Sequence, residues 1–207
     1  GPNDAPVISG TFTGEVTEDQ ALTASGKVTV TDPDIGDTAT WSIANEGHGT
    51  YGQLTLDQEG HWSYVLDNSS AQGLRAGQTA QDVFPLRVTD GAGAVAEHQI
   101  AVTVAGTNDA PVITGTFTGA AQEDITLTSS GTLAVRDADV GDHATWSIDG
   151  AATSTYGQFS INAETGHWVY TLNNDAAQSL PDGQVVHETF TVRATDTAGA
   201  TTTQIVS

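Results

Sequence analysis

The sequence contains no cysteine and no methionine, and it has few basic residues. Without cysteine it can form neither a disulfide nor a zinc site with thiolate ligands. Five Lys and Arg residues stand against 26 Asp and Glu residues, for a formal net charge of −21. This balance argues against binding to nucleic acid, whose phosphates require basic side chains, and against anionic membrane surfaces. It favours a chain that binds cations or that stays soluble in salt.

Long apolar runs are also missing, so we expect no membrane insertion. No signal peptide is visible, and we interpret Gly1 and Pro2 as the remnant of an expression tag. Charged residues make up only 15% of the chain, and hydrophobic residues make up 37%, including four Trp. This composition is typical of folded domains rather than of an acidic disordered segment.

The chain repeats itself once. The stretch "NDAPVISGTFTG" at Asn3–Gly14 returns as "NDAPVITGTFTG" at Asn108–Gly119, and Trp41 corresponds to Trp146 in the same alignment. Two tandem copies of one domain are therefore predicted. The predicted boundaries are a tag remnant at residues 1–2, a first repeat at 3–105, a short linker at 106–111 and a second repeat at 112–207. Pro111 makes this linker stiff in comparison with a Gly/Ser tether.

Each copy is predicted to consist of strands. In "HWSYVL" the residues Trp62, Tyr64 and Leu66 alternate with polar ones, which is the period of a half-buried strand. In the first copy we expect strands near residues 6–13, 27–31, 39–44, 52–57, 60–66, 82–89 and 95–105. The fold class is therefore all-β, with two tandem seven-stranded Ig-like or cadherin-like β-sandwich domains joined by a short linker. The last strand of the second copy is truncated at Ser207.

Two stretches carry the same cluster of acidic side chains: "VTDPDIGDTATWSI" at Val30–Ile43 and "VRDADVGDHATWSI" at Val135–Ile148. Alternating strand directions place these turns at one end of each sandwich, together with the turn after the sixth strand. In tandem, that end of the second copy faces the opposite end of the first copy across the linker. The junction is predicted to gather Glu18, Asp19, Asp67, Asn108, Asp109, Asp137, Asp139 and Asp196, with Asp142 as the weakest member.

So many like charges are unfavourable together unless a cation neutralises them, and hard oxygen ligands favour Ca²⁺. Calcium is therefore the predicted cofactor, with an affinity of roughly 0.1–1 mM, as in extracellular modules. A weaker half-site is expected in the first copy, formed by Asp4, Asp32, Asp34 and Asp90. For a single copy, the alternative is that these aspartates only stabilise turns.

Other polar and aromatic residues receive structural interpretations. Asp57 and Glu59 lie in a hairpin and are interpreted as turn residues. His61 and His167 precede strand tryptophans and are interpreted as surface or packing residues. The four tryptophans are interpreted as core residues rather than as a platform for carbohydrate.

The pattern "VxDxDxGDxATWSI … FxVxxTDGAGA … VTVxGTNDAP" resembles the VCBS repeat over essentially the whole chain, in both copies. The resemblance implies tandem Ig-like or cadherin-like repeats of large, secreted bacterial adhesins of the RTX type, exported by type I secretion. More distantly the chain resembles cadherin repeats, whose calcium ligands would correspond here to Asp137, Asp139, Asp196, Asn108, Asp109 and Glu18. The linker "TNDAP" lacks an earlier Asp and a final Asn of the cadherin pattern, and "LDNSS" replaces its Asp-x-Glu. The number of ions per junction is therefore left open.

From these features we expect a calcium-rigidified extender, or stalk, of a bacterial surface adhesin that acts in cell adhesion and biofilm formation. Its expected partners are neighbouring repeats of the same chain and, through other regions of the parent, a host-cell, bacterial or abiotic surface. The chain is expected to be a monomer. It is not expected to be an enzyme, because the sequence shows no single set of a nucleophile, a base and an acid of the kind that a catalytic triad needs. The alternatives are a lectin-like ligand-binding module and a homophilic adhesion module.

Overall fold

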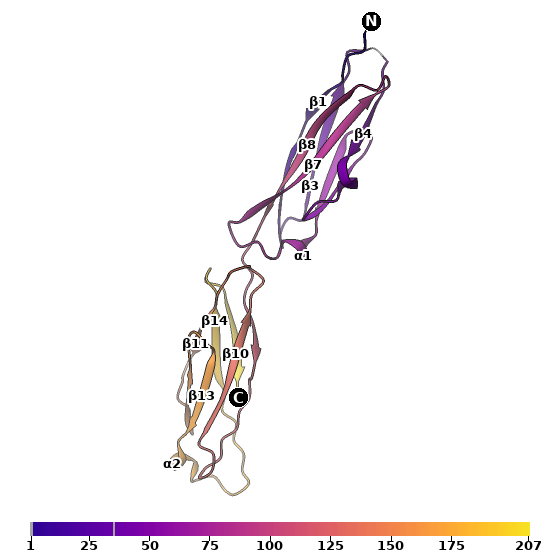
Figure 1. The fold of residues 1–207 in the computed structure, drawn as a ribbon. Helices are drawn as coiled ribbons and strands as arrows, with labels where there is room; N and C mark the ends of the chain where they lie inside the picture. Colours follow the sequence, from indigo (N-terminus) through magenta and orange to yellow (C-terminus); the bar gives the residue numbers. More distant parts are fainter. Residues whose placement is uncertain (1, 35) are drawn as a thin grey trace. The chain divides into compact units, whose positions relative to one another are not determined.

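The computed structural model describes residues 2–34 and 36–207 and divides into two compact units, Gly1–Thr107 and Asn108–Ser207 (Figure 1). Gly1, which belongs to the expected tag remnant, lies outside the described residues. Each unit consists of two β-sheets that enclose a hydrophobic core. The predicted all-β class is confirmed for both units.

The first unit is a sandwich of two four-stranded sheets within the described residues. The first sheet has the order β1 (Val7–Gly10), β3 (Thr23–Thr31), β6 (His61–Leu66) and β5 (Gly52–Leu56), with antiparallel neighbours. The second has the order β2 (Thr13–Thr17), β8 (Val95–Ala105), β7 (Thr79–Asp90) and β4 (Ala39–Ile43). Strand β2 runs parallel to β8, and the other pairs are antiparallel. The short helices η1 (Ala44–Gly47) and α1 (Asn68–Ala71) connect strands.

The first predicted strand, residues 6–13, is wrong as a single element, because the chain changes sheets within it. Gly10 has a φ of 121°, which favours glycine, and a Cβ there would lie 2.4 Å from the carbonyl oxygen of Lys27. After this kink Thr11 still donates its N–H to that oxygen over 2.8 Å, and the chain then enters the other sheet as β2. The kink therefore lets one segment close both sheets of the sandwich.

The core of the first unit follows the alternation of its strands. Trp62, Tyr64 and Leu66 of β6 all point inward and are buried. The Trp62 indole lies over Gly26, where a Cβ would be 2.6 Å from the ring, and its N–H donates to the Thr11 carbonyl over 2.9 Å. Full burial of a large apolar side chain contributes about 1.5–3 kcal/mol. This repeated inward row therefore holds the two sheets together.

The second unit repeats this plan with shorter strands. One sheet has the order β12 (Gly157–Ile161), β13 (His167–Leu172), β10 (Thr128–Arg136) and β9 (Val112–Gly115). The other has the order β11 (Thr145–Asp149), β14 (Phe190–Thr195) and β15 (Thr201–Val206), and α2 (Asn174–Ala177) corresponds to α1. The described residues 118–122, which correspond to β2, form no strand with β15. Among the described helices, none has the length and apolar character needed to cross a membrane.

All four tryptophans are buried, as the sequence predicted. Trp41 and Trp62 belong to the core of the first unit, and Trp146 and Trp168 belong to that of the second. None of the four is more than 6% exposed. They therefore offer no platform on which a sugar ring could stack.

Candidate metal centres

One end of the second unit gathers acidic side chains from two loops. Asp137 follows β10, Asp142 precedes β11, and Asp196 follows β14. Because β11 and β14 are antiparallel, with Thr145 opposite Thr195, the start of one strand meets the end of the other. Each of the three carboxylates offers an oxygen atom, and these oxygens lie within 4.8 Å of one another.

Hydrogen bonds fix the orientation of these loops. The Asp139 N–H donates to Asp137 Oδ1 over 2.9 Å, and the Asp142 N–H donates to the Asp139 carbonyl over 3.2 Å. The residues that precede β9 join them, because the Asp109 N–H donates to Asp139 Oδ2 over 2.8 Å. Asn108 Nδ2 donates to Asp196 Oδ2, also over 2.8 Å. The predicted residues Asn108, Asp109, Asp137, Asp139 and Asp196 are therefore brought together within this unit.

Three carboxylate oxygens of this cluster are buried and make no hydrogen bond with any described residue: Asp137 Oδ2, Asp139 Oδ1 and Asp142 Oδ2. A buried anionic oxygen without a partner is unfavourable, because it has lost its hydration without compensation. Aspartate oxygens are the ligands that Ca²⁺ prefers. The residues present therefore fit a hard divalent cation, which would supply the missing partner for each oxygen.

The charges in this cluster affect one another. Burial raises the pKa of the Asp137 carboxyl, and the neighbouring charges of Asp139, Asp142 and Asp196 raise it further. Burial also acts to raise the pKa of Asp196, but hydrogen bonds from the Asn108 side chain and the Ala200 N–H outweigh it and lower that pKa. The cluster thus combines a carboxyl whose pKa is lowered with one whose pKa is raised, and a bound cation would favour the charged form of both.

The first unit contains the same arrangement. Its cluster consists of Asp32, Asp37 and Asp90, whose carboxylates again offer oxygens within 4.8 Å of one another. The Asp4 N–H donates to Asp34 Oδ2 over 2.8 Å, as Asp109 does to Asp139 in the second unit.

Two further bonds of the first unit match those of the second. Asn3 Nδ2 donates to Asp90 Oδ2 over 2.9 Å, and this bond lowers the pKa of Asp90. The Asp34 N–H donates to Asp32 Oδ1 over 2.8 Å, and Asp32 Oδ2 is buried without a hydrogen bond to any described residue. The four residues of the predicted half-site, Asp4, Asp32, Asp34 and Asp90, therefore lie together.

Two members of these clusters were underrated by the sequence interpretation. Asp37 was left out of the predicted half-site, and its counterpart Asp142 was taken as the weakest member. The structure places both within the groups of close carboxylates. The signal was present in the sequence, because a Gly-Asp pair follows the first two aspartates in both copies.

The opposite end of the first unit holds two other predicted ligands. Glu18 is fully buried; its N–H donates to the Ala105 carbonyl over 3.0 Å, and its Oε1 accepts from the Thr107 N–H over 2.6 Å. Asp19 adopts a φ of 61° and exchanges two hydrogen bonds with Asn68, at 2.8 and 2.6 Å. The two hydrogen bonds of Glu18 thus tie it to the end of β8 and to Thr107, which follows it.

Asp67, another of the predicted ligands, lies at the N-terminus of α1. It is the N-cap of α1 and accepts hydrogen bonds from the Ser69 N–H and hydroxyl and from the Ser70 hydroxyl. The Ser69 hydroxyl contributes most to lowering its pKa. Because the cap engages both carboxylate oxygens, Asp67 stabilises a helix end in this structure.

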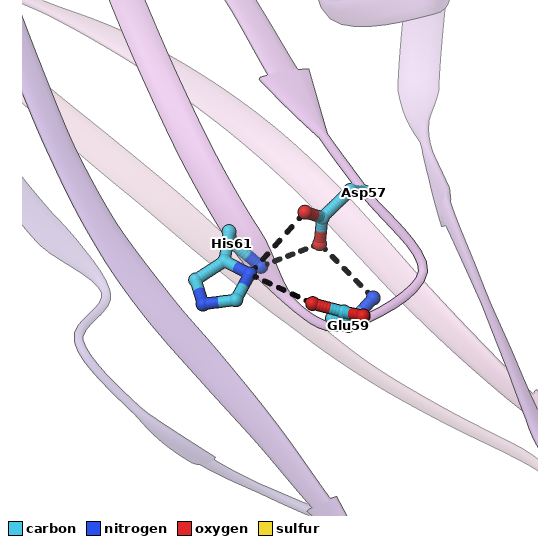
Figure 2. Close-up of side chains that lie close together, drawn as sticks. All are labelled: Asp57, Glu59 and His61. Atoms are coloured by element: carbon cyan, nitrogen blue, oxygen red, sulfur yellow. Dashed lines mark hydrogen bonds and ion pairs between the residues drawn. The ribbon is translucent and has the colours of Figure 1, made fainter.

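The β5–β6 hairpin brings Asp57, Glu59 and His61 together (Figure 2). Asp57 Oδ1 accepts from the N–H groups of Glu59 and His61, at 3.0 and 2.8 Å, and its Oδ2 lies 3.2 Å from His61 Nδ1. The His61 N–H is the main cause of the lowered pKa of Asp57. All three side chains are exposed, and the bonds are those of a turn, in agreement with the interpretation of Asp57 and Glu59 as turn residues.

Sequence reasoning missed a buried carboxylate in the first unit. Asp82 accepts hydrogen bonds from the N–H groups of Thr50, Tyr51 and Gly52, at 2.8, 2.9 and 3.0 Å, and from the Tyr64 hydroxyl at 2.7 Å. Burial is the main cause of the strongly raised pKa of Tyr64, which therefore stays a donor. The inward alternation of β7, extended back from Phe84, would have placed Asp82 inside the sandwich.

The second unit replaces this aspartate with Glu188. Its carboxylate accepts from the Tyr156 N–H at 2.8 Å, from the Ser154 hydroxyl at 2.7 Å and from the Tyr170 hydroxyl at 2.6 Å. These hydrogen bonds fix the loop before β12 to β13. The carboxylate is satisfied by donors, so it is a structural clamp rather than a metal ligand.

The two-sheet sandwich, with acidic turns at one end and an Asn-Asp segment bound to them, defines a cadherin-like repeat. The model of the bacterial cadherin-like domain matches residues 3–106 and 108–207. The chain therefore belongs to the bacterial cadherin-like domain family, in two tandem copies. No curated protein sequence matches it.

Solved structures of cadherins share the fold at low identity. Mouse cadherin-23 EC22-24 matches with 20% identity and a TM-score of 0.52, over 99% of this chain and 65% of that one. PcdhgB3 EC1-4 matches with 17% identity and a TM-score of 0.56, over 98% of this chain and 48% of that one. The chain thus spans less than two thirds of both. Cadherin-like repeats are in general extracellular, non-enzymatic modules of the adhesion type that typically bind Ca²⁺.

Proposed function

We propose that this chain is a calcium-rigidified extender segment of a large, secreted bacterial surface adhesin. The observation that carries the proposal is the Asp137, Asp142 and Asp196 cluster, in which buried carboxylate oxygens lack partners among the described residues. Its recurrence as Asp32, Asp37 and Asp90 supports a role that every repeat performs. A structural site is often present in every copy of a repeat, whereas a catalytic site seldom is.

The proposed calcium ligands include residues of each unit, as the sequence predicted. Thr107, the last residue of the first unit, is bound by Glu18, and Asn108, the first residue of the second unit, binds Asp196. Consecutive residues of the covalent chain are thus anchored to the acidic groups of different units. The proposed ligands are the predicted residues Glu18, Asp19, Asp67, Asn108, Asp109, Asp137, Asp139 and Asp196, together with Asp142.

Calcium would act on both stability and geometry. The ion supplies positive charge for oxygens that repel one another, so binding stabilises the folded state by mass action. An ion held by ligands from both units would also restrict rotation about the linker. At low cytosolic calcium the repeats would be less stable, which suits export as a loose chain that folds outside the cell.

Calorimetric titration with Ca²⁺ and thermal melts in EDTA and in millimolar Ca²⁺ test this proposal. The unchanged chain is expected to release or absorb heat and to gain about 1–2 kcal/mol if Ca²⁺ exceeds Kd by roughly tenfold. Asp137→Ala with Asp139→Ala is expected to lose most of this gain. No heat and no shift in melting would contradict the proposal and leave the clusters as turn chemistry.

Two matched variants act as controls. Asp57→Asn with Glu59→Gln removes two exposed acidic charges outside the clusters and is expected to leave calcium binding unchanged. Asp32→Ala with Asp34→Ala changes the first-unit cluster in the same way as the test variant changes the second. It is expected to remove a separate component of the titration, because the same arrangement of carboxylates recurs in that cluster.

The identity of the parent protein is part of the proposal. The quoted motifs support a VCBS-type repeat of an RTX adhesin, with type I secretion, adhesion and a role in biofilms. The proposed partners are neighbouring repeats and, through other regions, a cell or abiotic surface, and the chain itself is proposed to be a monomer. Burial of all four tryptophans disfavours the lectin-like alternative. Dimers that form only with Ca²⁺ in sedimentation experiments would instead support homophilic adhesion.

A further inference from the structure

The β5–β6 hairpin of the first unit brings an imidazole together with two carboxylates (Figure 2). His61 Nδ1 lies 3.2 Å from Asp57 Oδ2 and 3.6 Å from Glu59 Oε2. Each of the three residues offers one ligand atom, and these atoms lie within 4.8 Å of one another. The group differs from the acidic clusters, whose ligands are all carboxylates, because it includes a nitrogen ligand.

The spacing of these atoms fits a small divalent ion. Around a tetrahedral Zn²⁺ with ligands at roughly 2.0–2.2 Å, neighbouring ligand atoms are about 3.4 Å apart. The two distances from the imidazole nitrogen, 3.2 and 3.6 Å, lie on either side of this value. Imidazole is a ligand that suits Zn²⁺, Cu²⁺ and Ni²⁺, whereas Ca²⁺ takes oxygen ligands. The hairpin therefore has the chemistry of a transition-metal site rather than of a calcium site.

The turn itself holds two of the three ligands in place. Asp57 Oδ1 accepts from the N–H groups of Glu59 and His61, at 3.0 and 2.8 Å, so that Oδ2 faces the imidazole. Gly60 adopts a φ of 88°, and a Cβ there would lie 2.0 Å from the Val28 carbonyl oxygen, so the turn has little freedom. Outer partners of this kind orient the ligands of a metal. Glu59, whose side chain is 81% exposed, is the ligand that an ion would have to order.

The corresponding hairpin of the second unit keeps the histidine but not the group. Asn162 replaces Asp57, and the turn is one residue longer. Asn162 Oδ1 accepts from the Glu164 N–H over 2.9 Å, and His167 Nδ1 lies 3.4 Å from the Thr132 hydroxyl. Of the two hairpins, only the first gathers three ligands within the described residues. His167 is therefore a matched control for His61.

Charge and access both favour an ion at the first hairpin. The two carboxylates outweigh the single positive charge of Lys27, which pairs with His61 across β3 and β6. The side chains of Asp57 and His61 are about half exposed, at 54% and 53%, so a hydrated ion can reach them. A hollow of about 680 Å³ lies beside them and is also lined by Ser25 and Ser63. Water can therefore complete the coordination.

We propose that Asp57, Glu59 and His61 bind a divalent transition-metal ion such as Zn²⁺, at a site separate from the proposed calcium clusters. His61 supplies Nδ1, each carboxylate supplies one oxygen, and water supplies the remaining ligand. The bound ion would replace the contacts of the imidazole with the two carboxylates and would hold the hairpin in one conformation.

Calorimetric titration of the full chain with Zn²⁺ tests the proposal, in millimolar Ca²⁺ that competes at the clusters of carboxylates. Saturable Zn²⁺ binding is expected. His61→Asn should lower the affinity at least as much as the roughly 10–100-fold that the loss of an outer partner costs. Glu59→Gln should also weaken binding, and it leaves the hydrogen bonds of the turn intact because these come from the Glu59 backbone.

His167→Asn is the matched control and is expected to leave Zn²⁺ affinity unchanged. Melting curves without Zn²⁺ are expected to be the same for His61→Asn and the unchanged chain, which separates the loss of a ligand from unfolding. Co²⁺ in place of Zn²⁺ should give the visible absorption of a four-coordinate complex, and His61→Asn should abolish it. The absence of Zn²⁺ binding, or equal losses of affinity in the two histidine variants, would overturn the proposal.

Discussion

The two units share a sequence pattern but differ in how completely their cores are closed. Tyr64 is fully buried in the first unit, whereas Tyr170 of the second is only partly buried beside an open hollow. The acidic clusters show no such difference, because the bonds within each cluster recur from one unit to the other. Long-range strand pairing therefore determines the closure of the core, while short turns determine the candidate metal centres.

This contrast predicts that the units respond differently to the same change in the core. Trp62→Ala should destabilise the first unit by about 3–5 kcal/mol, because a large side chain packed on all sides is lost. Trp168→Ala should cost the second unit less, since this ring, although itself buried, lines a hollow on one side. Denaturant unfolding of each variant checks the order. Equal losses of unfolding free energy in the two variants would show that the hollow does not weaken packing in the second core.

The buried carboxylates should show the same asymmetry on a smaller scale. Asp82→Ala leaves three N–H groups and the Tyr64 hydroxyl without their acceptor, and a loss of about 2–3 kcal/mol is expected in the first unit. Glu188→Ala should cost less, because its donors are nearer to solvent. Thermal melts of both variants test this, with Tyr64→Phe as the control that removes a single donor. A larger loss for Glu188→Ala would contradict the comparison.

The acidic clusters should instead respond to calcium. Asp137→Asn with Asp142→Asn is expected to stabilise the protein in EDTA by about 1 kcal/mol, the scale of repulsion between like charges ~4 Å apart in a watery medium. In millimolar Ca²⁺ the same variant should be less stable than the unchanged chain, because it lacks ligands. Melting curves in both buffers would reveal this reversal. If the variant changed stability in the same direction in EDTA and in Ca²⁺, a cation at the cluster would be excluded.

The pH dependence of the calcium-free protein should carry opposite contributions from two residues. The raised pKa of Asp137 means that the folded state binds more protons than the unfolded state, so its contribution falls as pH rises from about 3.8 through that raised pKa. The lowered pKa of Asp196 stabilises the fold above 3.8, and that contribution is lost as pH falls through the folded pKa. Asp137→Asn should remove the first contribution in melts at several pH values. An unchanged pH profile would contradict the assigned shift.

The smallest effect is expected at the exposed hairpin. Asp57→Ala removes a turn acceptor and its contact with His61 at the surface, where an ion pair contributes about 0–1 kcal/mol. Stability should therefore fall by no more than about 1 kcal/mol, without any change in calcium affinity. Calorimetric titration of this variant with Ca²⁺ measures the affinity. A loss of calcium binding would indicate that the metal site lies at this hairpin instead.

Much of this structure could be predicted from the sequence because its signals are local. The alternation of Trp62, Tyr64 and Leu66 indicated a strand, and the repeated acidic turns indicated two related clusters. The change of sheet at Gly10 was missed, because a kink depends on the approach of the Lys27 carbonyl from another strand.

Other features were missed for the same physical reason. Asp82 was overlooked because its donors lie about 30 residues away along the chain. The helix cap formed by Asp67 was missed, because the pattern did not distinguish the start of a short helix from an irregular turn.

Calcium is proposed to restrict the motion of one unit relative to the other, and pulsed electron–electron double resonance would measure that restriction. Because the chain has no cysteine, Val65→Cys and Thr171→Cys, at exposed matched positions, would carry the only two spin labels. We expect a broad distribution of label-to-label distances in EDTA that narrows in millimolar Ca²⁺, and no narrowing after Asp137→Ala with Asp139→Ala. A distribution of the same width with and without calcium would contradict it.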